Sequence, residues 1–179
     1  LSSSSADEVI QKRILLKTDE AASELEKVYH QNDSVLRNLF SFSDAILDIK
    51  GYSGPGEFAK NFPFVPYQFI LIQKIYSEIR KHGNSGKHMS GGERSMLSGF
   101  QEAAQKIEEK DEFALAPLYL FYDTVHTFLD SSIRRVIERC DRAAMDGNGI
   151  QPQDVDVLKL LYLVRYVDDV KSNLDNIVI

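Results

Sequence analysis

The sequence predicts an all-α protein, an irregular multi-helix bundle with a long, partly irregular connection at about residues 34–65. Apolar residues recur at helical spacing along most of the chain, and Ser-x-x-Glu capping boxes, prolines and glycines mark several segment ends. The composition, 43% hydrophobic and 27% charged, is that of an ordinary globular domain. We expect a helical hairpin at 1–33, the connection at 34–65, and a helical bundle at 66–179 whose fold continues past the apolar end at Ile179.

The first predicted unit is the helical hairpin at residues 1–33. Ser5 and Glu8 form a capping box, and Thr18 is placed to cap a second helix that ends before Asn32. In the first helix, Val9, Ile10, Arg13, Ile14 and Leu16 follow at near-helical spacing. The apolar stripe of the second helix is Ala21, Ala22, Leu25, Val28 and Tyr29.

The connection at 34–65 is predicted from repeated interruption of its apolar pieces by Ser, Gly and Pro residues. It nevertheless carries bulky apolar side chains, which bury large areas, so we expect it to pack onto the helices. These residues are Phe58, Phe62, Phe64 and Val65.

Two amphipathic helices follow. The first begins at Pro66 and ends near Gly83, since proline suits a first helical turn and glycine suits a C-terminal cap. The second begins after the capping box of Ser90 and Glu93. Their apolar stripes are Phe69, Ile72, Ile75, Tyr76 and Ile79, then Met96, Leu97, Phe100, Ala103, Ala104 and Ile107.

The C-terminal part is predicted to hold the centre of the core. Residues 115–145 indicate two consecutive helices or one long bent helix, of which the first part is apolar nearly all round. Cys140 lies in the apolar stripe of the second part and is interpreted as a small core residue. A further helix begins at Pro152, and a short one is expected after Ser172.

Several classes of function are disfavoured. A net charge of −6 argues against extensive nucleic-acid binding, and no apolar run reaches the length of about eighteen residues needed to span a membrane. Because Cys140 has no second cysteine to pair with, we expect a reducing cytoplasmic location. The chain begins at Leu1 without a signal-peptide pattern, so we interpret it as part of a longer protein.

The loop and helix start at 83–94 form the first candidate site. Lys87 and Arg94 flank a predicted helix N-terminus, whose free N–H groups favour an anion such as phosphate. The alternative is an ordinary exposed loop with a cap. Residues 89–94 also resemble the signature loop of ABC-type ATPases, but the chain lacks a Walker A loop, so we expect no local ATP hydrolysis and no catalytic residue.

A metal site is not expected. The chain's histidines lie in separate segments without ligand spacing, and the calcium-loop likeness at 146–157 fails because Gln151 and Val157 occupy the sixth and twelfth positions.

Two local groups of basic residues are candidates for contact with DNA or with an acidic partner. Arg80 and Lys81 end one predicted helix, and Arg134 and Arg135 belong to another, together with Arg139 and Arg142. The alternative for both groups is a charged face that contacts only water. Tyr67 is a further candidate for partner contact.

Long strings of the sequence resemble the P-loop ATPase proteins of bacterial BREX phage-defence systems, the BrxC/PglY family. The strings are NFPFVPYQF at 61–69, KHMSGGERSML at 87–97 and FQEA at 100–103. QKRILLK at 11–17 is similar to the helix that leaves the nucleotide-binding core of that family. The resemblance covers about residues 10–145 and is weakest at 34–60.

This resemblance implies a helical lid, sensor or coupling region that follows an ATPase core and is inactive alone. ATP and Mg²⁺ are then implied for the intact protein, with Arg13, Lys87 or Arg94 as candidates for reaching a nucleotide phosphate. The implied partners are other BREX proteins and DNA through the intact assembly, and a homo-oligomer is compatible with the sequence. The alternative is a helical scaffold that binds proteins through Phe62, Phe64 and Tyr67 without contacting nucleotide.

Overall fold

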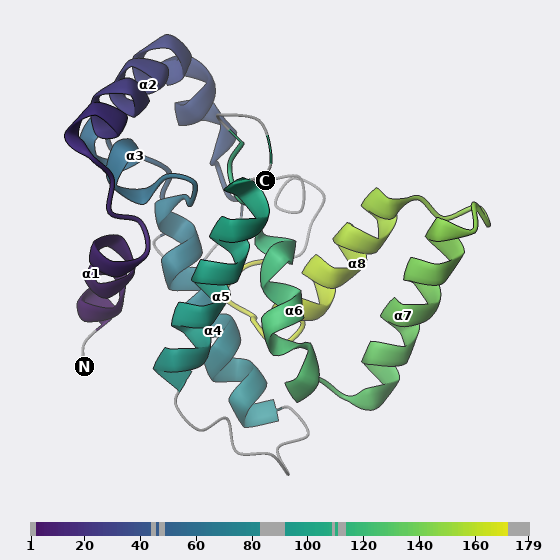
Figure 1. Cartoon of the computed structure of the whole chain (residues 1–179). Helices are drawn as coiled ribbons and strands as arrows, with labels where there is room; N and C mark the ends of the chain where they lie inside the picture. The colour runs from purple at the N-terminus through teal and green to yellow at the C-terminus, as the bar shows by residue number, and fades with distance from the viewer. Residues whose placement is uncertain are drawn as a thin grey trace.

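The computed structural model describes residues 3–43, 46, 49–82, 92–108, 110 and 114–171, and every regular element within these ranges is helical. The predicted all-α class is therefore confirmed. Figure 1 shows an irregular arrangement of helices. The elements are α1 (Ser3–Arg13), α2 (Asp19–Leu39), α3 (Pro55–Asn61), α4 (Pro66–His82), α5 (Gly92–Glu108), η1 (Leu118–Phe121), α6 (Tyr122–Val125), η2 (His126–Phe128), α7 (Ser131–Met145) and α8 (Pro152–Val164).

The second helix begins as predicted but runs farther. The Thr18 hydroxyl accepts a hydrogen bond from the Ala21 N–H at 3.2 Å, which confirms the cap. The expected end before Asn32 is wrong, because the polar residues there find partners inside the helix. The Asn32 amide donates to the Val28 carbonyl at 2.9 Å, and Arg37 pairs with Asp33 one turn earlier.

The connection predicted at 34–65 is shorter than expected, because its first residues belong to α2 and it contains the short helix α3. Its aromatic residues pack as predicted: Phe58 is 2% exposed and Phe64 is fully buried. The Tyr52 ring lies 4.9 Å from the Phe58 ring, and its hydroxyl donates to the Phe64 carbonyl at 2.9 Å. Burial therefore orders this segment where periodicity does not.

The core is one cluster that joins α4 and α5 to residues 115–145, where its centre was predicted. Phe100 of α5 stacks on Phe69 of α4 at 5.0 Å between ring centroids, and it meets Phe64 and Phe121 edge-on at 4.9 Å each. Figure 1 shows α4 and α5 side by side at the middle of the molecule. Ser90 lies outside the described residues, so the capping box predicted for α5 is not tested.

The segment before α7 differs from both predicted alternatives. It forms the short turns η1, α6 and η2 in place of one helix, and α7 begins only after Asp130, whose carboxylate accepts from the Ser132 N–H at 2.7 Å. Sequence periodicity could not show this, because a segment that is apolar on every side is compatible with several backbone paths. Its burial was predicted correctly, since Phe121 and Val125 are fully buried.

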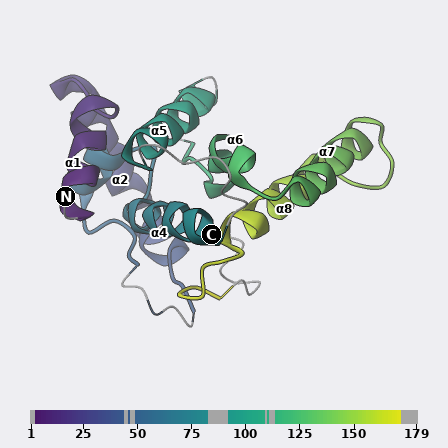
Figure 2. The same cartoon turned by 90° about the horizontal axis from the view of Figure 1, so that it is seen from below.

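Helices α7 and α8 form an antiparallel hairpin that stands out from the body in both views (Figures 1 and 2). The turn between them uses Gly147 and Gly149 at φ of 68° and 81°, a region that favours glycine.

Cys140 is half-buried and packs against the core, as predicted. The helix expected after Ser172 lies outside the described residues. None of the described helices has the length and hydropathy needed to cross a bilayer.

We predict that Gln68→Leu destabilises the protein. The buried Gln68 amide accepts from the Val65 N–H at 2.9 Å and donates to the Ala116 carbonyl at 2.7 Å, and leucine leaves both groups unsatisfied. A loss of about 2–4 kcal/mol in unfolding free energy is expected in urea titrations. The control Gln31→Leu, on the exposed face of α2, should change it by less than about 0.5 kcal/mol. Equal effects of the two substitutions would contradict this role for Gln68.

Candidate functional site

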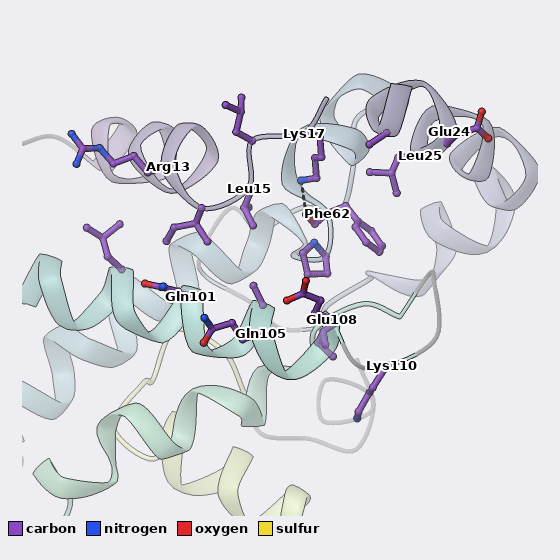
Figure 3. A pocket seen from close by; sticks show the side chains of 17 residues that line it. Arg13, Leu15, Lys17, Glu24, Leu25, Phe62, Gln101, Gln105, Glu108 and Lys110 are labelled. Atoms are coloured by element: carbon purple, nitrogen blue, oxygen red, sulfur yellow. Dashed lines mark hydrogen bonds between the residues drawn. The ribbon is translucent and has the colours of Figure 1, made fainter. Parts of the chain in front are cut away.

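An open groove of about 980 Å³ lies between α5 and the link that joins α1 to α2, residues 14–18 (Figure 3). Its apolar lining comes from the link, from the start of α2, from the turn after α3 and from α5. Arg13 lies toward one end in Figure 3 and Lys110 toward the other, with Lys17 between them. The apolar lining residues are Ile14, Leu15, Leu16, Ala21, Leu25, Phe62, Pro63, Leu97, Ala104 and Ile107.

The link alternates between buried and exposed side chains. Helix α1 stops where the N–H groups of Ile14 and Leu15 both bond the Ile10 carbonyl, at 2.9 and 3.1 Å. Leu15 then points into the core at 5% exposure, whereas Leu16 is 79% exposed. The next residue, Lys17, turns back toward α3. The chain thereby forms one wall of the groove with an exposed leucine and a partly buried lysine.

Lys17 is bound by backbone carbonyls. Its ammonium donates to the Phe62 carbonyl at 2.6 Å and to the Lys60 carbonyl at 3.5 Å, two groups at the end of α3 that lack helical partners. No carboxylate among the described residues lies within 4.0 Å of it, and burial lowers the pKa of Lys17 to about 8. The lysine thus fixes the link to the end of α3 without an ion pair.

Helix α1 is tied to two other helices. The Gln11 amide donates to the Asn61 side-chain oxygen at 2.7 Å, which joins α1 to α3. The Gln73 amide donates to the Asp7 carboxylate at 3.2 Å, which joins α1 to α4. Partial burial raises the pKa of Asp7. Together with Lys17, these contacts hold α1 in a defined position on the body.

Of the three predicted phosphate candidates, only Arg13 has a side chain within the described part of the structure. Arg13 is exposed beside the groove, and it has no ion pair within the described residues. Lys87 lies outside the described residues. Arg94 lies in the first turn of α5, and its side chain is likewise outside the described part.

The basic pair at the end of α4 differs in surroundings. Lys81 donates to Glu78 at 2.9 Å, and Glu78 also lies 3.5 Å from both Lys74 and His82. The hydrogen bond from Lys81 is the main reason that the pKa of Glu78 is lowered. Lys81 is therefore engaged within the chain, whereas Arg80 is exposed.

Tyr67 was predicted to contact a partner, and this is wrong for its ring. The residue is 4% exposed, and its ring lies 4.8 Å from Phe42 and 6.0 Å from Phe40. Burial raises the pKa of its hydroxyl. Phe64 is fully buried as well, so of the aromatics named for partner contact only Phe62 lines the groove.

The two residues of α7 predicted to contact DNA or a partner, Arg134 and Arg135, differ in exposure. Arg134 is half-buried, and its Nε is buried without a hydrogen-bond partner in the described structure. Arg135 is exposed.

Among the described residues, no group of three or more His, Cys, Asp or Glu side chains is placed so that it could hold a metal ion.

Sequence reasoning missed Gln11 and Lys17 as positioning residues, although both stand in the 11–17 string that carries the family resemblance. A polar residue directly after a run of three apolar ones, between two predicted helices, was the available signal. Its partner could not be found that way, because Phe62 is 45 residues distant in sequence.

No family model matches this sequence, and no solved structure matches the chain.

We predict that stability rises between about pH 8 and pH 9.5 because of Lys17. Its folded-state pKa lies near 8, below the usual value, so in this window the unfolded chain binds more protons and raising the pH favours folding. Above about pH 10 the trend reverses, since burial raises the pKa values of Tyr52, Tyr67 and Tyr76.

Urea titrations across pH 7–10 would measure this dependence. Lys17→Met should remove the rise, and the control Lys12→Met, at an exposed lysine paired with Glu8, should retain it. A rise that persists unchanged in Lys17→Met would show that another group causes it.

Proposed function

We propose that this chain is a helical accessory region of a BREX-type P-loop ATPase in bacterial anti-phage defence, and that it couples the nucleotide state of an upstream core to contacts with DNA or with other defence proteins. Support comes from the resemblance of its strings at 11–17, 61–69 and 87–97 to that family. The function places it in the cytoplasm.

The observation that carries the proposal is a direct contact between two of these strings. Gln11 and Lys17, in the string similar to the helix that leaves the nucleotide-binding core, bond Asn61 at 2.7 Å and the Phe62 carbonyl at 2.6 Å. Asn61 and Phe62 open the second string. Residues 62–65 connect α3 to α4, and we call them the α3–α4 turn. A displacement of α1 would therefore be passed to this turn without crossing a flexible linker.

The α3–α4 turn in turn contacts the rest of the body. The Pro63 carbonyl accepts from the Ala116 N–H at 2.9 Å, and Phe64 packs on Phe100 and Phe121. A movement that begins at α1 can reach α5 and the segment before α7 through these contacts. This is a continuous packed path, which is what mechanical coupling between two sites needs.

ATP and Mg²⁺ belong to the intact protein in this proposal. Arg13 supports a phosphate role because it is exposed at the end of α1 and is not engaged by a carboxylate of the described residues. Lys87 and Arg94 stay candidates for the same role by their place in the 87–97 string.

A second candidate function is a protein-binding scaffold without a nucleotide role. It is favoured by the open groove and by the 79% exposure of Leu16 on its wall, since a large exposed apolar side chain beside an apolar groove suits a partner protein.

The two functions differ in the ATP turnover of the intact protein. We expect no turnover by the isolated chain. In the intact ATPase, Lys17→Met should lower turnover by about tenfold, the effect of losing roughly 1.4 kcal/mol of coupling, while circular dichroism shows unchanged folding. The matched control is Lys12→Met, which removes an exposed lysine from α1, five residues before Lys17.

Turnover by the isolated chain would contradict the accessory role. Normal turnover in both Lys17→Met and Arg94→Ala, with folding retained, would leave the scaffold as the better description.

A further inference from the structure

Helix α7 has one face in the core and an arginine-bearing face opposite to it. Ile133 and Ile137 are 3% and 2% exposed. Arg135, Arg139 and Arg142 are exposed, and their i, i+4, i+7 spacing places them in one row on the other side of the helix. We call these three residues the arginine stripe. At 1.5 Å of rise per residue it is roughly 10 Å long.

The stripe is unpaired, which sets it apart from other charged helix faces of this chain. Within the described residues, no carboxylate lies within 4.0 Å of its guanidinium groups. Arg142 Nε donates a hydrogen bond to a backbone group, the Glu138 carbonyl, at 3.3 Å. Several other exposed cations of the helices are paired with an acidic residue one turn away. These pairs are Lys12–Glu8, Lys27–Glu24, Arg37–Asp33 and Lys81–Glu78.

The acidic residues of α7 leave the stripe exposed. Asp141 turns toward α8, where Lys159 lies 3.8 Å away, and Asp130 caps the start of α7. Glu138 is the one acidic side chain of α7 beside the stripe. The exposed Ser131 and Ser132, four and three residues before Arg135, continue this face toward the start of α7.

The position of α7 makes the stripe accessible. The α7–α8 hairpin stands out from the body in both views, with α8 beside α7 (Figures 1 and 2). The side of α7 that faces α8 carries Asp141, which is not part of the stripe. The exposed apolar residues Val136 and Met145 lie at the edges of the stripe, not within it.

We propose that the arginine stripe binds the phosphate backbone of a nucleic-acid duplex. Guanidinium groups form paired hydrogen bonds with phosphate oxygens, and serine hydroxyls are common phosphate partners as well. A protein partner would favour an apolar or aromatic centre within the contact, and the stripe has none. The inference rests on the proposed coupling function for its biological role, because it names the partner class that the ATPase engages.

Binding through this surface is weak, sequence-independent and sensitive to salt. The net charge of −6 limits the contact to this local patch. Each phosphate neutralised on B-DNA contributes about −0.9 to the slope of log affinity against log salt, so three arginines predict a slope of about −2.7. A dissociation constant of roughly 10⁻⁴ to 10⁻⁶ M is typical of such contacts at physiological salt.

The test is fluorescence anisotropy of a labelled duplex of about 20 base pairs, titrated with the chain at several salt concentrations. Wild type should bind with the slope given above. The variant Arg135→Gln/Arg139→Gln/Arg142→Gln should bind at least about tenfold more weakly with a slope near zero. The control Lys12→Gln/Lys27→Gln/Arg37→Gln makes the same change of charge on α1 and α2 and should bind like wild type.

Three results would overturn the proposal. They are absence of duplex binding by the wild type at low salt, equal weakening in both triple variants, and tighter binding to a poly-glutamate peptide than to the duplex. None of these results affects the ATP-turnover comparison at Lys17. If the stripe fails and that comparison succeeds, the coupling function stands with a different partner.

Discussion

The α3–α4 turn is the constraint on which the rest of the structure depends. This turn is partly buried and not helical, so some of its backbone groups bond neighbouring backbone and others need partners from other segments. Those partners come from along the chain. The Tyr52 hydroxyl bonds the Phe64 carbonyl, Gln68 bonds both Val65 and Ala116, and the Lys17 ammonium bonds the Phe62 carbonyl. Residues far apart in sequence are thereby held around one short stretch.

This constraint explains how a groove and a tethered helix arise together. The Phe62 carbonyl is a polar group next to apolar surface, and Lys17 can satisfy it only if the link after α1 crosses over the end of α3. That crossing leaves Leu16 outside and places the link opposite α5. The groove is the space between the two. A contact made to satisfy a backbone group therefore also helps to set the position of α1.

Charged side chains are arranged differently on helices α1, α2 and α4 and on the α7–α8 hairpin. Helices α1, α2 and α4 each pair an exposed cation with an acidic residue one turn away. The hairpin of α7 and α8 uses Asp141 to bind Lys159 across its interior, and its outer arginines stay unpaired among the described residues. The α7–α8 hairpin thus differs from helices α1, α2 and α4 in presenting a row of arginines without carboxylate partners among the described residues.

The sequence by itself determined the all-α class, the bounds of the strongly amphipathic helix α4, the Thr18 cap and the helix start at Pro152, because these depend on local periodicity and on residues a turn apart. Tertiary structure decided the rest. Asn32 continues a helix that its composition alone would end, Tyr67 is buried although an exposed role was expected, and the apolar segment at 118–128 folds as short turns. The Lys17 contact also depends on the fold, since its partner is 45 residues away. Long-range burial and the need to satisfy buried backbone groups fix these features, and neither leaves a periodic signal in the sequence.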